Sequence, residues 1–185
     1  MKPESNPPDE SIQTLYRGNW LTLCQRGHWE YVERNNAGGA VIIIAVTDDD
    51  KLLFVEQYRH PIDKRTIEMP AGLVGDLEES GDEDALMAAR RELEEETGFA
   101  CDSIKFVHAG PSSAGLSTEI MTFVRATGLR RVGQGGGDES EQITVHEVPR
   151  TKAGPWLFEM AGKGYSIDPK LFAGLWFLEH SRQSD

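Results

Sequence analysis

A run of nine residues, Arg91–Phe99, constrains this chain more than any other segment. It places four glutamates in five positions and stops at Gly98, a residue that commonly closes a helix. At about 100° per residue, Glu92 and Glu96 point in nearly the same direction on one helix, and Glu95 lies close to them. Like charges at this spacing destabilise an isolated helix by some tenths of a kcal/mol. The run therefore indicates either a solvated acidic face or a site for a hard cation that binds carboxylate oxygens.

The residues around this run resemble the signature of the Nudix hydrolases, Gly-x5-Glu-x7-Arg-Glu-U-x-Glu-Glu-x-Gly-U, where U is bulky and apolar. Glu83 and the run Arg91–Phe99 fit every position from the first glutamate onward. Leu77 occupies the position of the signature glycine, and Gly72 is the equivalent glycine in this sequence. The acidic loop 75–82 therefore contains about five extra residues.

The resemblance implies a Mg²⁺-dependent enzyme, with Mn²⁺ as the alternative ion. The implied ligands are the carboxylates of Glu92, Glu95 and Glu96, together with the backbone carbonyl of Ala71. We interpret Arg91 as a salt-bridge partner that holds these glutamates in place, not as a substrate ligand.

The catalytic base stays open between several glutamates. In ADP-ribose-type relatives the base lies on a loop downstream of the signature, and the segment 110–119 resembles their Ser-Pro-Gly-x-Ser-x-Glu stretch. Glu119 is therefore the first candidate, Glu139 and Glu141 are the alternatives, and Glu95 has an assisting role. Each of these side chains could instead simply face solvent.

Two further segments resemble the motif Gln-Tyr-Arg … Glu-x-Pro-Ala-Gly of ADP-ribose and nucleotide-sugar pyrophosphatases. In them, Arg59 offers a planar fork suited to phosphate oxygens, and Glu68 could accept ribose hydroxyls or assist a metal. A structural salt bridge between Arg59 and Glu68 is the alternative.

Two tryptophans match residues that sandwich the adenine in such relatives. They are Trp20 and Trp29, and stacking on an indole stabilises a bound base by about 1–3 kcal/mol. Without the resemblance, both would be interpreted as core or interface aromatics.

The resemblance also implies a homodimer, because the N-terminal strands of such relatives pair with, or swap onto, a partner subunit. Residues 12–36 would then serve dimerisation and base binding, and residues 37–185 would form the hydrolase domain. The implied reaction splits the pyrophosphate bond of ADP-ribose or a related nucleoside diphosphate sugar into a nucleoside monophosphate and a sugar phosphate. GDP-mannose and ADP-glucose are alternative substrates. A Nudix-fold nucleotide sensor without turnover is the rival, and the intact glutamates favour the enzyme.

The composition fits a single globular domain of 185 residues, with 38% hydrophobic and 27% charged residues. No apolar run approaches the roughly 18–20 residues that span a bilayer, and the N-terminus has no signal-peptide core. The net charge is −12, of which −8 falls between Asp76 and Glu96. This charge argues against nucleic acid and anionic membranes as partners. Two cysteines without metal-like spacing, Cys24 and Cys101, favour the reducing cytoplasm.

Apolar periodicity and turn residues predict an α/β fold, which the resemblance specifies as an α/β/α sandwich with mixed sheets and an N-terminal β-hairpin. Residues 1–11 are predicted to be a disordered tail, and the tract Gly133–Gly137 a flexible loop. Helices are expected at 84–97, 151–160 and 169–180. Strands are expected at 16–25, 28–34, 40–46, 51–58, 66–69, 104–109, 120–126 and 142–148.

Overall fold

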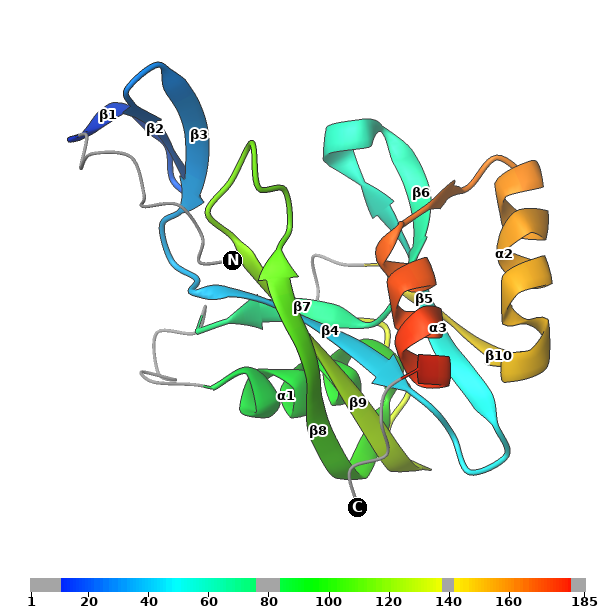
Figure 1. The fold of residues 1–185 in the computed structure, drawn as a ribbon. Coiled ribbons are helices and arrows are strands. Elements are labelled where there is room, and N and C mark those ends of the chain that lie inside the picture. The colour runs from blue at the N-terminus through cyan, green and yellow to red at the C-terminus, as the bar shows by residue number, and fades with distance from the viewer. Residues whose placement is uncertain (1–10, 76–83, 138–141, 181–185) are drawn as a thin grey trace, which may run out of the picture.

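The computed structural model describes residues 11–75, 84–137 and 142–180, which form an α/β fold with three sheets (Figure 1). A small antiparallel sheet at the N-terminus has the order β1-β2-β3, and two four-stranded sheets have the orders β7-β4-β9-β8 and β10-β5-β6-β11. The strands are β1 (Ile12–Arg17), β2 (Leu21–Arg26), β3 (Trp29–Arg34), β4 (Gly39–Ala45), β5 (Lys51–Arg59), β6 (Lys64–Glu68), β7 (Ala71–Val74), β8 (Phe99–Pro111), β9 (Ile120–Arg131), β10 (Thr144–Pro149) and β11 (Ser166–Ile167).

Helices cover the two four-stranded sheets from opposite sides (Figure 1). Helix α1 (Ala85–Thr97) packs on the β7-β4-β9-β8 sheet, whereas α2 (Ala153–Gly162) and α3 (Lys170–His180) pack on the far side. Strand β4 pairs in parallel with β9, and β6 in parallel with β11, so both sheets are mixed. This arrangement confirms the predicted α/β/α sandwich. No helix in the described ranges is long and apolar enough to cross a membrane.

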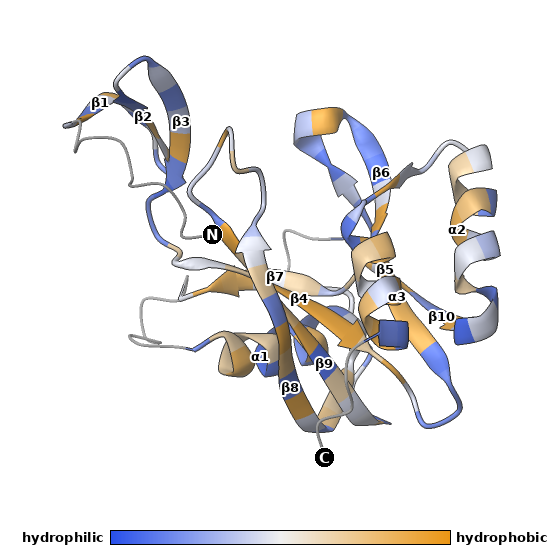
Figure 2. Cartoon of the chain, viewed as in Figure 1, coloured by the Kyte–Doolittle hydropathy of each residue, from blue (hydrophilic) through white to orange (hydrophobic). Residues whose placement is uncertain are grey.

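Strand β4 divides the interior into two cores. Successive side chains of a strand point to opposite faces, so Val41 and Ile43 pack in the core beneath α1, while Ile42 and Ile44 pack in the core beneath α2 and α3. All four side chains are buried. Figure 2 shows the corresponding hydrophobic colour along this strand. A continuous apolar run is what a strand buried on both faces requires.

The predicted signature helix is confirmed with its C-cap at Gly98, and the structure adds an N-cap at Asp84. The side chain of Asp84 accepts hydrogen bonds from the backbone N–H groups of Leu86 and Met87, each at 2.9 Å. At the other end, Gly98 adopts a left-handed conformation with φ of 73° and ends the helix. The side chain of Leu93 is fully buried on the core face.

The tract Gly133–Gly137, predicted to be a flexible loop, instead closes the C-terminal end of α1. Gly136 N–H donates to the carbonyl of Glu96 at 2.9 Å, and Gly137 N–H donates to that of Glu95 at 3.1 Å. The last carbonyls of a helix lack partners within the helix, and the tract supplies them. A Cβ atom on Gly135 would lie 2.4 Å from the carbonyl carbon of Thr97, so only glycine allows this approach.

The N-terminal region differs from the prediction in its first strand. The strand expected at 16–25 is broken by a tight turn in which Gly18 N–H donates to the carbonyl of Leu21 at 2.8 Å. The region is therefore a three-stranded sheet, with the predicted hairpin as its second half, turning at Gly27. Residues 1–10 of the predicted tail lie outside the described residues.

Two short strands, β7 and β11, were not predicted. Strand β7 lies between turn residues, and β11 has only two residues, so neither shows the alternation on which a strand prediction depends. Both nevertheless carry residues of the cleft described below.

Gly135→Ala should lower the free energy of unfolding by about 1–3 kcal/mol, the cost of a residue held in an unfavourable backbone region. Gly135 has φ of 67° and contacts the backbone of Thr97. Gly154→Ala in α2 is the matched control, because an added Cβ meets nothing within 4 Å there and alanine favours a helix. Urea denaturation of both variants measures the difference. Equal stabilities would contradict a close approach of the tract to α1.

Candidate active site

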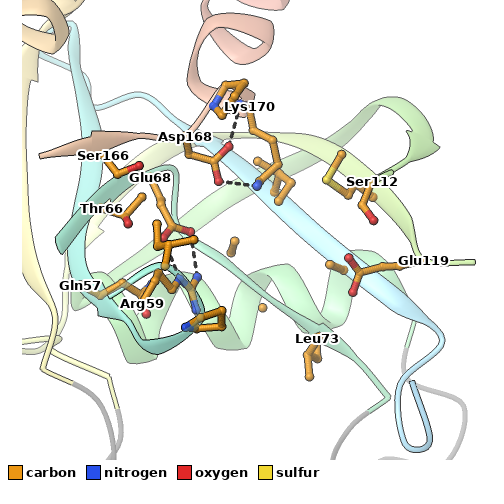
Figure 3. Close-up of a pocket in the computed structure, with 18 of the residues that line it drawn as sticks. Gln57, Arg59, Thr66, Glu68, Leu73, Ser112, Glu119, Ser166, Asp168 and Lys170 are labelled. Atoms are coloured by element: carbon orange, nitrogen blue, oxygen red, sulfur yellow. Dashed lines mark hydrogen bonds and ion pairs between the residues drawn. The ribbon is translucent and has the colours of Figure 1, made fainter. Parts of the chain in front are cut away.

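A cleft of about 740 Å³, lined by residues of both four-stranded sheets, collects polar side chains from several parts of the chain (Figure 3). Its walls come from β3 to β7, from α1, from the segment between β8 and β9, and from the chain around β11. The polar and charged side chains that line it are Arg34, Gln57, Arg59, Thr66, Glu68, Glu92, Glu96, Ser112, Glu119, Ser166, Asp168 and Lys170.

The floor of the cleft joins α1 to β7. Glu96 is only 2% exposed, and its Oε2 accepts a hydrogen bond from the N–H of Ala71 at 2.9 Å. A Cβ atom on Gly72 would lie 1.9 Å from the Cδ of Glu92. A side chain at position 72 would therefore displace the carboxylate of Glu92 from its present place. The structure brings together three of the predicted metal ligands, Ala71, Glu92 and Glu96.

Arg91 holds two of the glutamates by ion pairs, as the sequence predicted. Its Nη1 lies 2.8 Å from Oε1 of Glu92 and 3.1 Å from Oε2 of Glu95. Its Nη2 also donates to the carbonyl of Leu73 at 3.4 Å. Glu95 itself is exposed and lies outside the lining of the cleft. This position suits the assisting role expected for Glu95 better than a role as a central metal ligand.

The donor set at the floor suits a hard divalent ion. Mg²⁺ commonly takes one or two protein carboxylates and completes its shell with water and substrate phosphates. Glu92 and Glu96 provide two such carboxylates within one cleft. Among the described residues, no three or more carboxylate, histidine or cysteine side chains are grouped so that they could hold a metal ion. An ion held by two carboxylates would take the rest of its shell from water and substrate phosphates.

Arg59 and Glu68 form a bidentate ion pair in the cleft, the alternative that the sequence left open. Nε and Nη2 of Arg59 each lie 2.7 Å from one oxygen of Glu68. The carboxylate is buried and the guanidinium is partly exposed. The pair joins the end of β5 to the end of β6 (Figure 3). The buried carboxylate thus fixes the arginine fork at the cleft wall.

Glu119 lies in the cleft wall and is held by a residue that the sequence did not single out. Nε of Arg34, on β3, lies 2.6 Å from Oε1 of Glu119. Two backbone bonds attach the same segment to β3, from Val32 N–H to the carbonyl of Leu116 at 2.9 Å and from Thr118 N–H to that of Val32 at 3.2 Å. The small N-terminal sheet therefore supports the segment that carries Glu119.

The two alternative candidates for the catalytic base, Glu139 and Glu141, lie outside the described residues. The described chain before them, at Gly137, is bonded to the end of α1.

The two predicted base-stacking tryptophans lie on the N-terminal sheet and outside the lining of the cleft. Trp29 is 54% exposed, and its indole N–H donates to the carbonyl of Gly115 at 3.0 Å. Trp20 is exposed in the turn between β1 and β2. Neither is a core aromatic of this chain. Trp29 contacts the segment that carries Glu119, whereas no hydrogen bond joins Trp20 to that segment among the described residues.

Sequence reasoning missed the cleft residues outside the motifs. Arg34, Asp168 and Lys170 carry no local signal, because each becomes part of the cleft only through strand pairing distant in sequence. With them, three ion pairs surround the cleft: Arg34 with Glu119, Arg59 with Glu68, and Lys170 with Asp168.

Both cysteines lie outside the cleft lining and are buried. Burial is the main cause that raises the pKa of the Cys24 and Cys101 thiols. Protonated, buried thiols are poor nucleophiles, so the chemistry of the site depends on its carboxylates and guanidinium groups.

Several known proteins are similar to this chain. The methanol dehydrogenase activator of Bacillus methanolicus is 38% identical over 122 residues, covering 65% of this chain and 63% of the relative. The ADP-ribose pyrophosphatase of Bacillus subtilis (strain 168) is 37% identical over 111 residues, 60% of this chain and 57% of the relative. The chain thus spans about three fifths of these two relatives. The GDP-mannose pyrophosphatase of Enterobacter sp. (strain 638) is 33% identical over 162 residues, 82% of this chain and 78% of the relative.

A solved structure described as an ADP compounds hydrolase has the same fold. It superimposes with a TM-score of 0.70 at 20% sequence identity and covers 96% of both chains. The sequence profile of the NUDIX domain matches residues 37–162, which include β4 to β10 and α1 with its glutamates. The chain therefore belongs to the Nudix family.

Proposed function

We propose that this chain hydrolyses the pyrophosphate bond of ADP-ribose or a related nucleoside diphosphate sugar, giving a nucleoside monophosphate and a sugar phosphate. The observation that carries the proposal is the meeting of Glu92 and Glu96 with Glu119 and the Arg59–Glu68 pair in one cleft. Product analysis with a panel of nucleoside diphosphate sugars and Mg²⁺ tests it directly.

The proposed roles follow from the positions of the side chains. Glu92 and Glu96, with Glu95 assisting and the carbonyl of Ala71, would hold Mg²⁺ or Mn²⁺. The bound ion would supply positive charge that neutralises the phosphate oxygens. Arg59 is fixed by its ion pair through Nε and Nη2, and its guanidinium would bring positive charge to a phosphate.

Glu119 orients the attacking water and accepts its proton. Arg34 contacts Oε1 of Glu119, so Oε2 is the oxygen assigned to the water. The water oxygen bonds to one phosphorus, the bond from that phosphorus to the bridging oxygen breaks, and the leaving phosphate takes the electron pair.

The relatives support this substrate class and provide a second candidate. ADP-ribose is the substrate named for the Bacillus subtilis relative, and GDP-mannose is named for the Enterobacter relative, which matches more of this chain. GDP-mannose is therefore the main alternative substrate. A cytoplasmic location fits two free, buried cysteines.

A homodimer is part of the proposal, with the N-terminal sheet as its interface. Every residue of β1 is exposed, so this strand has an open edge. Isolated sheets of this size are marginally stable, and exposed strand edges readily pair with another chain. Large hydrophobic side chains are exposed on this sheet and its turns: Ile12, Leu15, Tyr16, Trp20, Leu21 and Trp29.

Glu96→Gln should abolish most activity and leave the fold intact. Glutamine keeps an oxygen for the Ala71 N–H but loses the charge that binds the cation, so we expect kcat to fall about a thousandfold or more. Glu94→Gln, an exposed glutamate of the same helix outside the cleft, is the matched control. EDTA should abolish wild-type activity, and added Mg²⁺ should restore it. Near wild-type hydrolysis by Glu96→Gln would contradict the metal assignment.

Glu119→Gln should lower kcat about 10²- to 10⁴-fold while KM changes only a few-fold, the pattern expected for a lost general base. Glutamine can still accept the hydrogen bond from Arg34, so the segment should keep its position. Steady-state kinetics measures both parameters. If Glu119→Gln is silent and Glu139→Gln or Glu141→Gln is inactive, the base lies after the glycine tract.

Trp29→Ala should raise KM for ADP-ribose about 5- to 100-fold, from the 1–3 kcal/mol of lost stacking. Trp29→Phe separates stacking on the base from the hydrogen bond to Gly115, because phenylalanine keeps an aromatic face but loses that bond. If Trp29 stacks on the base, KM of Trp29→Phe should stay near the wild-type value. Trp176→Ala, which removes an exposed indole on α3, is the control.

Sedimentation identifies the effect of the other tryptophan. If Trp20→Ala produces monomers, this ring belongs to the dimer interface. If Trp20→Ala raises KM in an intact dimer, the Trp20 ring stacks on the base of the substrate. An unchanged KM for Trp29→Ala would remove the residue-level reason for a purine substrate.

A further inference from the structure

Asp168 and Lys170 bring the C-terminal part of the chain into the cleft. They lie beyond residues 37–162, the part that matches the NUDIX domain. Strand β11 pairs in parallel with β6, and Asp168 N–H donates to the carbonyl of Ile67 at 3.0 Å. This bond fixes Asp168 beside β6, one residue from the Glu68 that holds Arg59. The C-terminal segment therefore forms a wall of the proposed active site.

The two side chains form a pair with a defined orientation. Asp168 accepts the backbone N–H of Lys170 at 2.8 Å through Oδ1, and Oδ2 pairs with the Lys170 ammonium. The Asp168 side chain is 11% exposed and that of Lys170 is 30% exposed. Figure 3 shows both side chains in the cleft, above Glu68 and Arg59 in this view. The pair is thus mostly shielded from solvent, and both of its side chains line the cleft.

The charge of this pair limits what it can bind. A carboxylate and an ammonium together carry no net charge, so the pair can bind a neutral ligand without leaving a charge unpaired. It does combine acceptors and donors within a few ångströms. Neighbouring hydroxyl groups match such a pair, because each hydroxyl both donates and accepts hydrogen bonds. A carboxylate accepts from hydroxyl protons, and an ammonium donates to hydroxyl oxygens.

We propose that Asp168 and Lys170 form the subsite for the sugar attached to the second phosphate of the substrate. This inference rests on the proposed pyrophosphatase activity and specifies its substrate as one with a neutral, polyhydroxylated group at that end. Ser166, which pairs with Thr66 across β11 and β6, lines the adjacent wall with a further hydroxyl. The C-terminal segment then selects the sugar, and the glutamates of α1 and Glu119 act on the diphosphate.

A pair of substrates isolates the sugar contact. ADP-ribose and the β-methyl ester of ADP share the adenosine and the diphosphate diester, but the ester has no sugar hydroxyls beyond the second phosphate. The measured quantity is the ratio of kcat/KM for ADP-ribose to kcat/KM for the ester. The ratio is independent of the fraction of active enzyme, so partial misfolding of a variant does not affect it.

Two variants and one control test the pair. Asp168→Asn keeps an acceptor for the Lys170 N–H and removes the charge, and Lys170→Met keeps the length of the side chain. Each should lower the ratio about 10- to 100-fold, because a hydrogen bond to a charged group is lost. Lys163→Met, at the exposed end of α2 and outside the cleft, should leave the ratio unchanged.

Each result has a separate meaning. A lower ratio in both cleft variants, with the control unchanged, supports the sugar subsite. If the wild type hydrolyses both substrates and neither cleft variant changes the ratio by more than about twofold, the subsite is wrong and the pyrophosphatase proposal stands. The same holds if Lys163→Met lowers the ratio equally. If the wild type hydrolyses neither these two substrates nor GDP-mannose, the proposed function itself is wrong, and the subsite with it.

Discussion

The hydrogen bond between Ala71 N–H and the carboxylate of Glu96 is the contact on which the cleft depends. Burying a carboxylate is costly unless hydrogen bonds replace its water, and Glu96 is almost completely buried. The bond from Ala71 compensates part of that cost and fixes α1 against the start of β7. Once these elements are joined, the backbone at Gly72 meets Glu92 so closely that a side chain there would displace the Glu92 carboxylate. The glycine, the two glutamates and the strand form one unit.

The sequence predicted those features whose signals are local. The helix expected at 84–97 and its end at Gly98 follow from residue types within one or two helical turns, and the structure has both. The buried strand β4 follows equally well from its continuous apolar run. In the candidate site, Ala71, Glu92 and Glu96 were identified because a long motif contains them and their spacing places both glutamates on one helix face.

Features that depend on distant pairing could not be predicted. Strand β11 exists only because β6 lies beside it, and it brings Asp168 to the cleft from a part of the sequence without any motif. Arg34 likewise reaches Glu119 only after β3 docks on the segment between β8 and β9. The glycine tract was misinterpreted for a related reason. Its composition indicates a flexible backbone, but in this chain the glycines permit close contact with the end of α1.

The three ion pairs show how an acidic protein can prepare a site for an anionic substrate. Each cation of the pairs is fixed by a carboxylate, so the arginines and the lysine have defined positions before substrate binds. The partners come from different parts of the chain: the N-terminal sheet, the centre of the NUDIX domain and the C-terminal segment. The Arg59–Glu68 pair and the glutamates of α1 lie within the family domain and suit the diphosphate of the proposed substrates. The other two pairs use residues outside 37–162: Arg34, which pairs with Glu119, and Asp168 with Lys170. Changes in these flanking segments could therefore alter which substrate is selected without disturbing the chemistry on the diphosphate.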